Sequence, residues 1–249
     1  MLRSIGKVLF GKILPRYAYP VIRGPLRGKK FILGTLGGKG GGGTVYFNML
    51  EPEQTAAFAK SLKPSYTFFD VGANVGYYTV LGSKLVGDKG KVIAFEPLVR
   101  NISYLYRHIV LNKLKNVILI PSACADEISL ATFSAGPNTA MGHISENNGN
   151  NDKTEEKLTV VPVLTLDAVA EKLNCKPNVL KIDVEGAEVA VLHGAQNILR
   201  QAKPKIFLSV HSDVLKSQCL EYLYGFNYKC EPLDASFENA REFYCFSNQ

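Results

Sequence analysis

The chain has 249 residues, 46% of them hydrophobic and 20% charged, and this length and composition allow one large globular domain. The sequence includes no apolar run of the roughly 20 residues that a transmembrane helix needs. The net charge of +7 comes from the first 30 residues, where eight Lys and Arg stand without an Asp or Glu, whereas the remainder carries 21 basic and 22 acidic residues. This balance excludes a basic nucleic-acid groove over the whole domain, and we expect no specific nucleic-acid partner.

The cysteines and the amino-terminal residues indicate in which cellular compartment the protein is expected. Five cysteines without a Cys-x-x-Cys pair favour free thiols in a reducing compartment over a disulfide framework or a zinc site. Arg3 and Lys7 interrupt the apolar stretch from Met1 to Phe10, which is not typical of a secretory signal. We therefore expect a cytoplasmic protein. Its basic terminus either contacts an anionic surface, such as a membrane or an acidic acceptor, or remains solvated.

The first 60 residues predict only short elements. Residues 2–13 have the apolar spacing of a helix, and Pro15 prevents its continuation. The glycine-rich run 37–43 lacks the Gly-Lys-Ser/Thr ending of a phosphate loop, so we expect a turn between two short strands. A short helix is expected over residues 51–62. The chain is divided into a basic amino-terminal segment, 1–60, and a main domain, 61–249.

From residue 66 onward, short β-branched runs alternate with helical patterns. This alternation predicts an α/β fold with a doubly wound, mostly parallel sheet, and the short link between the last two strands predicts an antiparallel edge strand. An extra strand pair, 130–133 and 158–161, flanks a polar loop over residues 135–157. The predicted strands are 66–71, 91–95, 117–120, 179–183, 206–210, 228–230 and 243–246, and the predicted helices are 77–85, 99–111, 166–173, 189–200 and 214–224.

A glycine turn follows the first of these strands, where such sheets bind their ligands. Gly72 permits the turn, and Gly76 permits close packing of the helix that follows. A dinucleotide fingerprint needs glycines where Asn74 and Tyr77 stand, so a pyrophosphate is disfavoured. S-adenosylmethionine has no phosphate. Asp70 can engage its ammonium group and the N–H groups at the helix start its carboxylate; the alternative is a purely structural turn.

Two further acids follow later strands. Glu96 ends the second strand 24 residues after Gly72, the place of a carboxylate that accepts both ribose hydroxyls of an adenosyl cofactor. The alternative for Glu96 is a capping or surface acid. Asp126 follows the third strand and could accept from the adenine amino group, although a turn acid is nearly as good an explanation.

Three motifs together resemble the FkbM family of methyltransferases: Phe69–Thr79, Ala94–Pro97 and Lys181–Glu188, within a similarity that covers about residues 66–211. The resemblance implies a seven-strand, Rossmann-like class I methyltransferase fold and S-adenosylmethionine as methyl donor. It also implies O-methylation of a hydroxyl on a sugar, glycolipid or natural-product acceptor. It assigns cofactor binding to Asp70, Gly72, Asn74, Gly76 and Glu96, and it places Asp183 and Glu185 in the site.

One position departs from the family pattern. Many members read Glu-Val-His after the fifth strand, whereas this chain reads Ser209-Val210-His211. The histidine is kept, and the acid that could partner it there is replaced by Ser209.

The predicted catalytic residues are Asp183, His211 and Glu185, at the ends of neighbouring strands. An alcohol must lose its proton before it attacks, so Asp183 or His211 could act as the base, or Asp183 could help hold a divalent metal. Only Glu185 is evident as a further oxygen ligand, so the sequence favours metal-independent catalysis. As structural alternatives, Asp183 and Glu185 cap a helix and His211 is an ordinary buried histidine.

Two other functions share the pattern. A nicotinamide-dependent oxidoreductase would have a similar strand, turn and ribose acid, but it would need the missing glycines. A non-catalytic accessory module would be expected to lose Asp70, Glu96 or Asp183, and all three are present. The acceptor itself cannot be named, because residues 1–60 and 135–157, which should shape its pocket, contain no motif.

Overall fold

The computed structural model describes residues 17–35, 43–135, 142–144 and 158–247. A seven-stranded sheet with the strand order β12-β13-β11-β10-β3-β4-β5 forms its centre. The strands are β3 (Thr67–Val71), β4 (Lys91–Phe95), β5 (Val117–Ile120), β10 (Val179–Ile182), β11 (Lys205–Ser209), β12 (Tyr228–Pro232) and β13 (Glu242–Ser247).

The pairing directions confirm the predicted fold class. Strands β5, β4, β3, β10 and β11 pair parallel to one another in that order. Strand β13 pairs antiparallel with both β11 and β12, so antiparallel pairing is confined to one edge of the sheet. All seven strands correspond to predicted ones.

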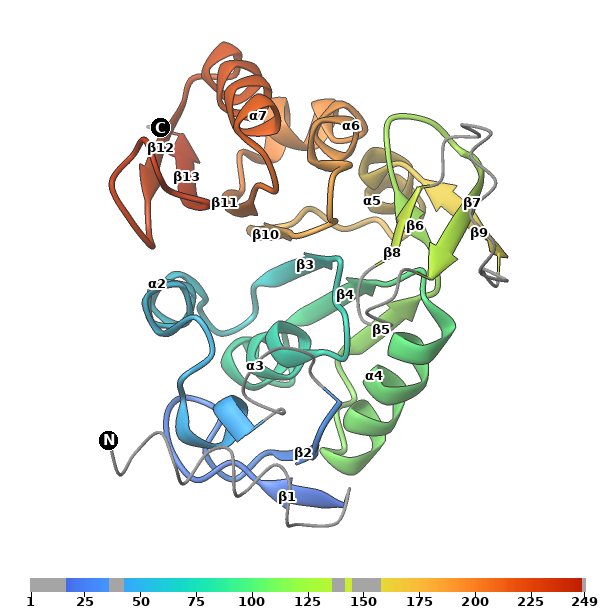
Figure 1. The fold of residues 1–249 in the computed structure, drawn as a ribbon, viewed down its shortest axis with the longest axis vertical. Helices are drawn as coiled ribbons and strands as arrows, with labels where there is room; N and C mark the ends of the chain where they lie inside the picture. The colour runs from blue at the N-terminus through green and yellow to red at the C-terminus, as the bar shows by residue number, and fades with distance from the viewer. Residues whose placement is uncertain (1–16, 36–42, 136–141, 145–157, 248–249) are drawn as a thin grey trace, which may run out of the picture.

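Helices cover both faces of this sheet, as Figure 1 shows. One face carries α2 (Pro52–Ser61), α3 (Tyr77–Val86) and α4 (Val99–Leu111), and the other carries α5 (Leu166–Lys172), α6 (Glu188–His193) and α7 (Asp213–Gly225). Because both faces are buried, the strands are almost continuously apolar. Successive side chains alternate between the two layers: Phe69 and Val71 belong to the core under α5, α6 and α7, whereas Phe68 packs toward α2 and α3.

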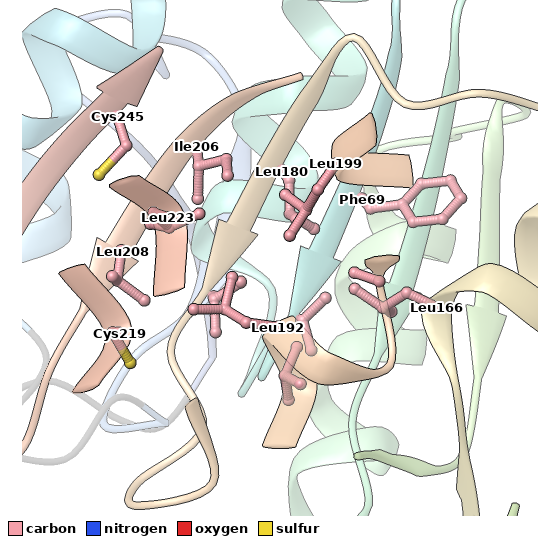
Figure 2. Close-up of a cluster of buried hydrophobic side chains, with 14 of the residues drawn as sticks. Phe69, Leu166, Leu180, Leu192, Leu199, Ile206, Leu208, Cys219, Leu223 and Cys245 are labelled. Carbon is pink, nitrogen blue, oxygen red and sulfur yellow. The ribbon is translucent and has the colours of Figure 1, made fainter. Parts of the chain in front are cut away.

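The core on the α5–α7 face is fully shielded from water. Phe69, Leu180 and Ile206 from three adjacent strands meet Leu192 and Leu223 from the helices above them, as Figure 2 shows. Each of these side chains has no exposed surface. This packing fixes the strand ends, and therefore the residues that follow them, in one place.

The described part of the amino-terminal segment packs on the opposite core. It contains β1 (Ala18–Pro20), β2 (Lys30–Ile32) and a 3₁₀ helix (Gly43–Phe47). His108 of α4 joins it to the glycine turn, since its Nε2 accepts from Ile32 N at 3.0 Å and its Nδ1 donates to Val75 O at 2.7 Å. Burial lowers the pKa of His108 to about 4, which agrees with a neutral ring in these roles.

Two predictions for this segment meet different outcomes. A strand does precede the glycine-rich run, but the strand expected after it is wrong, because residues 43–47 form a 3₁₀ helix in which Val45 and Tyr46 are buried. The predicted helix 2–13 and most of the run 37–43 lie outside the described residues.

A second, four-stranded sheet with the order β6-β9-β7-β8 lies beside β5 and α5 (Figure 1). The predicted extra pair is confirmed, since β7 (Ser129–Ala135) and β9 (Leu158–Leu164) pair antiparallel. Two short strands, β6 (Ala123–Cys124) and β8 (Gly142–Ile144), complete the sheet and were not predicted. Most of the predicted loop 135–157 lies outside the described residues.

The helix predicted over residues 189–200 is interrupted. α6 ends at His193, and a π-helical turn covers Ile198–Ala202. The carbonyl of Gly194 accepts from the backbone N of Asp167 at 2.9 Å, so it is directed toward α5. A Cβ at Gly194 would lie 2.0 Å from the carbonyl oxygen of Ala125, so only glycine permits this approach.

The expectation of free thiols is wrong for one pair. Cys230 and Cys245 face each other across β12 and β13 and form a disulfide, while Cys124, Cys175 and Cys219 are free. Sequence spacing could not reveal this pair, because it depends on strand register. Among the described residues, no helix is both long and apolar enough to cross a membrane.

Candidate active site

Strand register brings the predicted site residues to one edge of the sheet. Val71 pairs with Phe95 on one side and with Ile182 on the other, so β3, β4 and β10 end in the same row. The next residues in the chain are Gly72, Glu96 and Asp183. Three segments that are far apart in the sequence therefore meet at the carboxyl ends of the parallel strands, where α/β sheets bind ligands.

A cavity of about 540 Å³ opens at this edge. Five predicted residues line it: Gly72, Asn74, Glu96, Asp183 and Glu185. The other lining residues come from the last residues of β3 and β4, from the turns after β4 and β10, from α4, from the residues around β6, from β7 and from α6. They are Val71, Phe95, Pro97, Leu98, Asn101, Ser122, Ala123, Cys124, Phe133, Val184, Gly186, Ala187 and Ala190.

Both predicted glycines are required by close approaches. Gly72 has φ +81°, and a Cβ on it would lie 1.8 Å from the carbonyl oxygen of Asp183. Gly76 has φ +93°, and its Cβ would lie 2.3 Å from a methyl carbon of Leu105 on α4. Gly72 therefore shapes the cavity directly, whereas Gly76 lets α3 and α4 pack closely and does not line the cavity.

Glu96 is buried at the centre of a hydrogen-bond network. Its Oε2 accepts from Asn74 N at 2.7 Å, and its Oε1 accepts from Leu98 N at 3.0 Å and from Asn101 Nδ2 at 3.2 Å. Burial raises the pKa of Glu96, and these three donors oppose that rise by stabilising the charged form. The carboxylate thus holds both turns around the cavity in place.

Two polar atoms in the cavity wall lack a partner. Asn74 Oδ1 and Ser122 Oγ are buried and form no hydrogen bond within the described part of the chain. Asn74 adopts the left-handed conformation, with φ +50°. A buried polar atom without a partner costs free energy, so such atoms in a cavity wall indicate a polar ligand.

Asp70 lies outside the cavity lining. Side chains alternate along β3, and Asp70 points toward α3, where its Oδ2 accepts from Thr79 Oγ1 at 2.5 Å. Burial raises its pKa to about 6, and the nearby Lys181 ammonium opposes that rise. Asp70 is thus not among the residues that line the cavity, and its contact with a bound ammonium group stays a prediction.

Asp126 is also outside the cavity. Its side chain is exposed, and the chain before it is turned away by the hydrogen bond from Ala125 N to Leu164 O. The buried Ser122 occupies the lining instead. The predicted adenine contact of Asp126 is therefore not supported by its position.

Asp183, Glu185 and His211 meet at the rim of the cavity, although they come from different elements. Nε2 of His211 lies 3.2 Å from Glu185 Oε2 and 3.7 Å from Asp183 Oδ1. The three side chains are 32% to 35% exposed, so a ligand can reach them. Glu185 has φ +53°, and the following Gly186 has φ +114°, so this turn holds the carboxylate in an unusual backbone conformation.

Two buried residues that sequence reasoning missed anchor this cluster. Lys181, with 2% exposure, donates to Asp183 Oδ2 at 2.8 Å, and Glu188, with none, accepts from His211 Nδ1 at 2.6 Å. Burial opposes ionisation of Asp183, but the Lys181 charge holds its pKa below the usual range. The hydrogen bond to Glu188 raises the pKa of His211.

The acid missing at position 209 is replaced from elsewhere in the fold. Ser209 Oγ donates to Glu242 Oε2 at 2.8 Å, and Gln54 Nε2 donates to the same oxygen. The histidine partner is Glu188, which lies inside the Lys181–Glu188 motif. Glu188 stands three residues after Glu185, and this spacing in the sequence could have indicated that it lies near the site. Its pairing with His211, however, depends on how α6 packs beside β11.

Comparisons with known proteins identify the family and the fold of the chain. Residues 70–243 match the profile of the methyltransferase FkbM domain. Hexuronic acid methyltransferase AglP of Haloferax volcanii is 29% identical over 146 residues, which are 59% of this chain and 56% of that protein. The crystal structure of methyltransferase FkbM from Methylobacillus flagellatus KT has a TM-score of 0.53 and 14% identity, over 85% of this chain and 56% of that one. The chain thus spans little more than half the length of either protein.

Proposed function

The chain belongs to the FkbM methyltransferase family, and we propose that it transfers the methyl group of S-adenosylmethionine to an oxygen atom of a sugar or sugar-like acceptor. The observation that carries this proposal is one cavity that joins a polar, partly unsatisfied wall to an ionic cluster at its rim. The wall fits the cofactor, and the cluster fits the activation of an acceptor oxygen.

The hydrogen-bond capacity of Glu96 suits one ribose hydroxyl. A carboxylate has about four acceptor sites, and protein donors use three of those on Glu96: two on Oε1 and one on Oε2. One site on Oε2 is therefore left for a ligand. The sequence suggested that Glu96 accepts both ribose hydroxyls; we now propose that it accepts one and that Asn74 Oδ1 accepts the other.

The partnerless atoms support the same assignment. Asn74 Oδ1 and Ser122 Oγ line the cavity on either side of Glu96 in the strand order, since they follow β3 and β5. Both would gain hydrogen bonds from the hydroxyl and amino groups of an adenosyl ligand. We propose Ser122, rather than the exposed Asp126, as the polar group nearest the adenine.

The ionic cluster supplies what methyl transfer requires of the protein. When bound, S-adenosylmethionine offers a methyl group on a sulfonium, and transfer to the acceptor oxygen leaves S-adenosylhomocysteine. The acceptor hydroxyl must also lose its proton. Asp183 Oδ1 faces the rim while Lys181 holds Oδ2, so this carboxylate is fixed in orientation and charged. We propose that Asp183 and its neighbours orient and deprotonate the acceptor.

The acceptor class rests on the relative from Haloferax volcanii, which acts on hexuronic acid. Hydroxyls and a carboxylate are both present on such a sugar, so two products are possible: a methyl ether or a methyl ester. We propose the ether, because a carboxylate needs no base, whereas the buried anchors Lys181 and Glu188 hold two proton-accepting side chains, Asp183 and His211, at the rim.

Calorimetry tests the cofactor assignment. The full chain is titrated with S-adenosylmethionine, S-adenosylhomocysteine and NAD, and we expect binding of the first two only. Binding of NAD without binding of either adenosyl ligand would reject the proposal.

Mass spectrometry tests the acceptor. Free hexuronic acids, neutral hexoses and oligosaccharides that contain either are incubated with the protein and cofactor, and the expected product is heavier by one CH₂. Mild alkali separates the two chemistries, because it hydrolyses an ester and leaves an ether intact. An alkali-labile product would confirm methyl transfer but would show that the product is an ester, which rejects methylation of a hydroxyl.

A further inference from the structure

We propose that Asp183, Glu185 and His211 form a binding site for a divalent cation of the magnesium and manganese type at the rim of the cavity. The inference rests on the proposed function and revises one role in it: with the cation bound, Asp183 would orient and polarise the acceptor hydroxyl as a ligand of the ion, and the released proton would go to water rather than to Asp183. One potential ligand atom from each residue lies within 4.8 Å of the others. The sequence provided only two acids for such a site, and the packing of β10 against β11 supplies the third donor, His211.

Two of the three proposed ligands, Asp183 and His211, are each bound by a buried charged residue through the atom that does not face the cluster. Lys181 binds Asp183 Oδ2, which leaves Oδ1 toward the cluster, and Glu188 accepts from His211 Nδ1, which directs Nε2 toward the two acids. Metal-binding histidines characteristically donate their other ring N–H to a carboxylate in this way. The arrangement fixes both the orientation and the tautomer that ligation requires.

Glu188 provides an independent observation, a buried carboxylate oxygen without a partner among the described residues. Its side chain has no exposed surface, and its Oε2 forms no hydrogen bond with any described residue, while Oε1 accepts from Gly186 N and His211. A buried carboxylate that is only half satisfied is costly unless a cation lies nearby. Glu188 stands directly behind the proposed ligand His211.

The local charge balance suits a divalent ion. Asp183, Glu185 and Glu188 provide three carboxylates, and Lys181 is the buried cation paired with Asp183. Two carboxylates among three ligands favour magnesium or manganese over softer metals, and both ions keep positions open for water or substrate oxygen.

The open side of the cluster defines the ligand chemistry. The three donors are about one-third exposed, and two of them, Asp183 and Glu185, line the cavity, so open coordination positions would face the acceptor. A sugar that offers two neighbouring hydroxyls could occupy two of these positions. A cation there would orient the acceptor and polarise the hydroxyl to be methylated.

The test measures binding of manganese in the absence of cofactor and acceptor. The full chain is stripped with EDTA and titrated with MnCl₂, and free Mn²⁺ is followed by electron paramagnetic resonance. We expect one bound ion per chain. The isosteric change Asp183→Asn and the change His211→Gln should each weaken binding by at least tenfold. Glu188→Gln, which alters only the group behind His211, should weaken it by about 10- to 100-fold.

Glu127→Gln is the matched control, because Glu127 is an exposed acid outside the cavity lining. It should bind manganese like the unchanged protein, and circular dichroism verifies that each variant is folded. Absence of binding at millimolar Mn²⁺, or equal binding by the control and by a folded Asp183→Asn, would overturn the cation site. If the stripped protein still binds S-adenosylmethionine and transfers methyl groups at full rate, the cation site fails and the proposed function stands. Binding of manganese without any binding of S-adenosylmethionine would support the cation site and reject the proposed function.

Discussion

The two halves of the cavity are built by different means. The cofactor half, formed by the turns after β3 and β4, is defined by backbone: Gly72 allows a close approach, and the N–H groups of Asn74 and Leu98 bind Glu96. The transfer half, at the ends of β10 and β11, is defined by charge, with Asp183 and His211 each held by a buried ion-pair partner.

The difference predicts how each half responds to change. A backbone-defined half tolerates little change in shape, because a single added carbon meets the main chain of a neighbouring strand. A charge-defined half tolerates changes of similar size when shape is kept, but it depends on which groups are ionised. Substitutions in the two halves should therefore separate folding, cofactor affinity and turnover.

Gly72→Ala should have the largest effect, because it breaks the contact at which the two halves touch. The added Cβ would meet the Asp183 carbonyl at 1.8 Å, and φ at +81° is unfavourable for alanine. We expect a loss of about 3 kcal/mol or more in the free energy of unfolding, measured with urea.

Gly28→Ala is the matched control for that change. Gly28 has φ +87°, but nothing lies within 4 Å of its added Cβ. The control therefore has the backbone penalty without the collision and should lose only about 1 kcal/mol. Equal losses in the two variants would mean that the approach to Asp183 contributes nothing.

Asp183→Asn should give the next largest effect, confined to the transfer half. The amide keeps the shape of the carboxylate but cannot take a proton and loses the ion pair with Lys181. We expect kcat to fall by about 100-fold or more while the Kd of S-adenosylmethionine stays unchanged. Steady-state rates and calorimetry measure the two. Full activity in this variant would shift the proposed base to His211.

Glu96→Gln should affect the cofactor half alone. The substituted amide can no longer accept at both oxygens, so the network around Asn74 and the proposed ribose contact are both weakened. Affinity for S-adenosylmethionine should fall by about 1–3 kcal/mol, with little change in kcat at saturation. Asp126→Asn, at an exposed position outside the cavity, should leave the affinity unaltered. A larger effect of Asp126→Asn than of Glu96→Gln would restore the adenine role first assigned to Asp126.

The contrast between the halves also explains what the sequence could predict. Gly72, Asn74 and Glu96 follow strands whose parallel pairing is implied by the alternation of strands and helices, so their meeting could be predicted. The parallel strands were predicted for the same reason, and the short link between the last two strands predicted the antiparallel edge. Local patterns were sufficient there because each functional residue is placed by the strand directly before it.

The transfer half depends on contacts that no local pattern contains. Pairing of His211 with Glu188 requires α6 to pack beside β11, and the presence of Glu242 next to Ser209 depends on the register of β13. The sequence also did not reveal that side-chain alternation directs Asp70 toward α3, where it accepts a hydrogen bond from Thr79. The Cys230–Cys245 pair likewise follows from strand register, which spacing alone does not reveal.

Glu242 offers the smallest but most specific test of the charge-defined half. Burial raises the pKa of this carboxyl from 4.5 to about 7, against the opposing effects of Lys181 and of the Ser209 hydroxyl. Between these values the folded protein keeps a proton that the unfolded chain has released. Stability should therefore fall as the pH rises from about 4.5 to 7, because the linkage favours the state that binds more protons at lower pH.

Glu242→Gln removes this titration and keeps an oxygen that can accept from Ser209 and Gln54. Relative to the unchanged protein, the variant should gain a few degrees in melting temperature between pH 5 and pH 8, with most of the gain complete by pH 7. Taking the difference between the two proteins cancels the titration of groups that they share. Ser209→Ala removes a hydrogen bond that lowers the pKa of Glu242, so in that background the gain should shift to higher pH. A difference in melting temperature that is constant from pH 5 to pH 8 would show that Glu242 is charged throughout this range. The raised pKa of Glu242 would then be wrong.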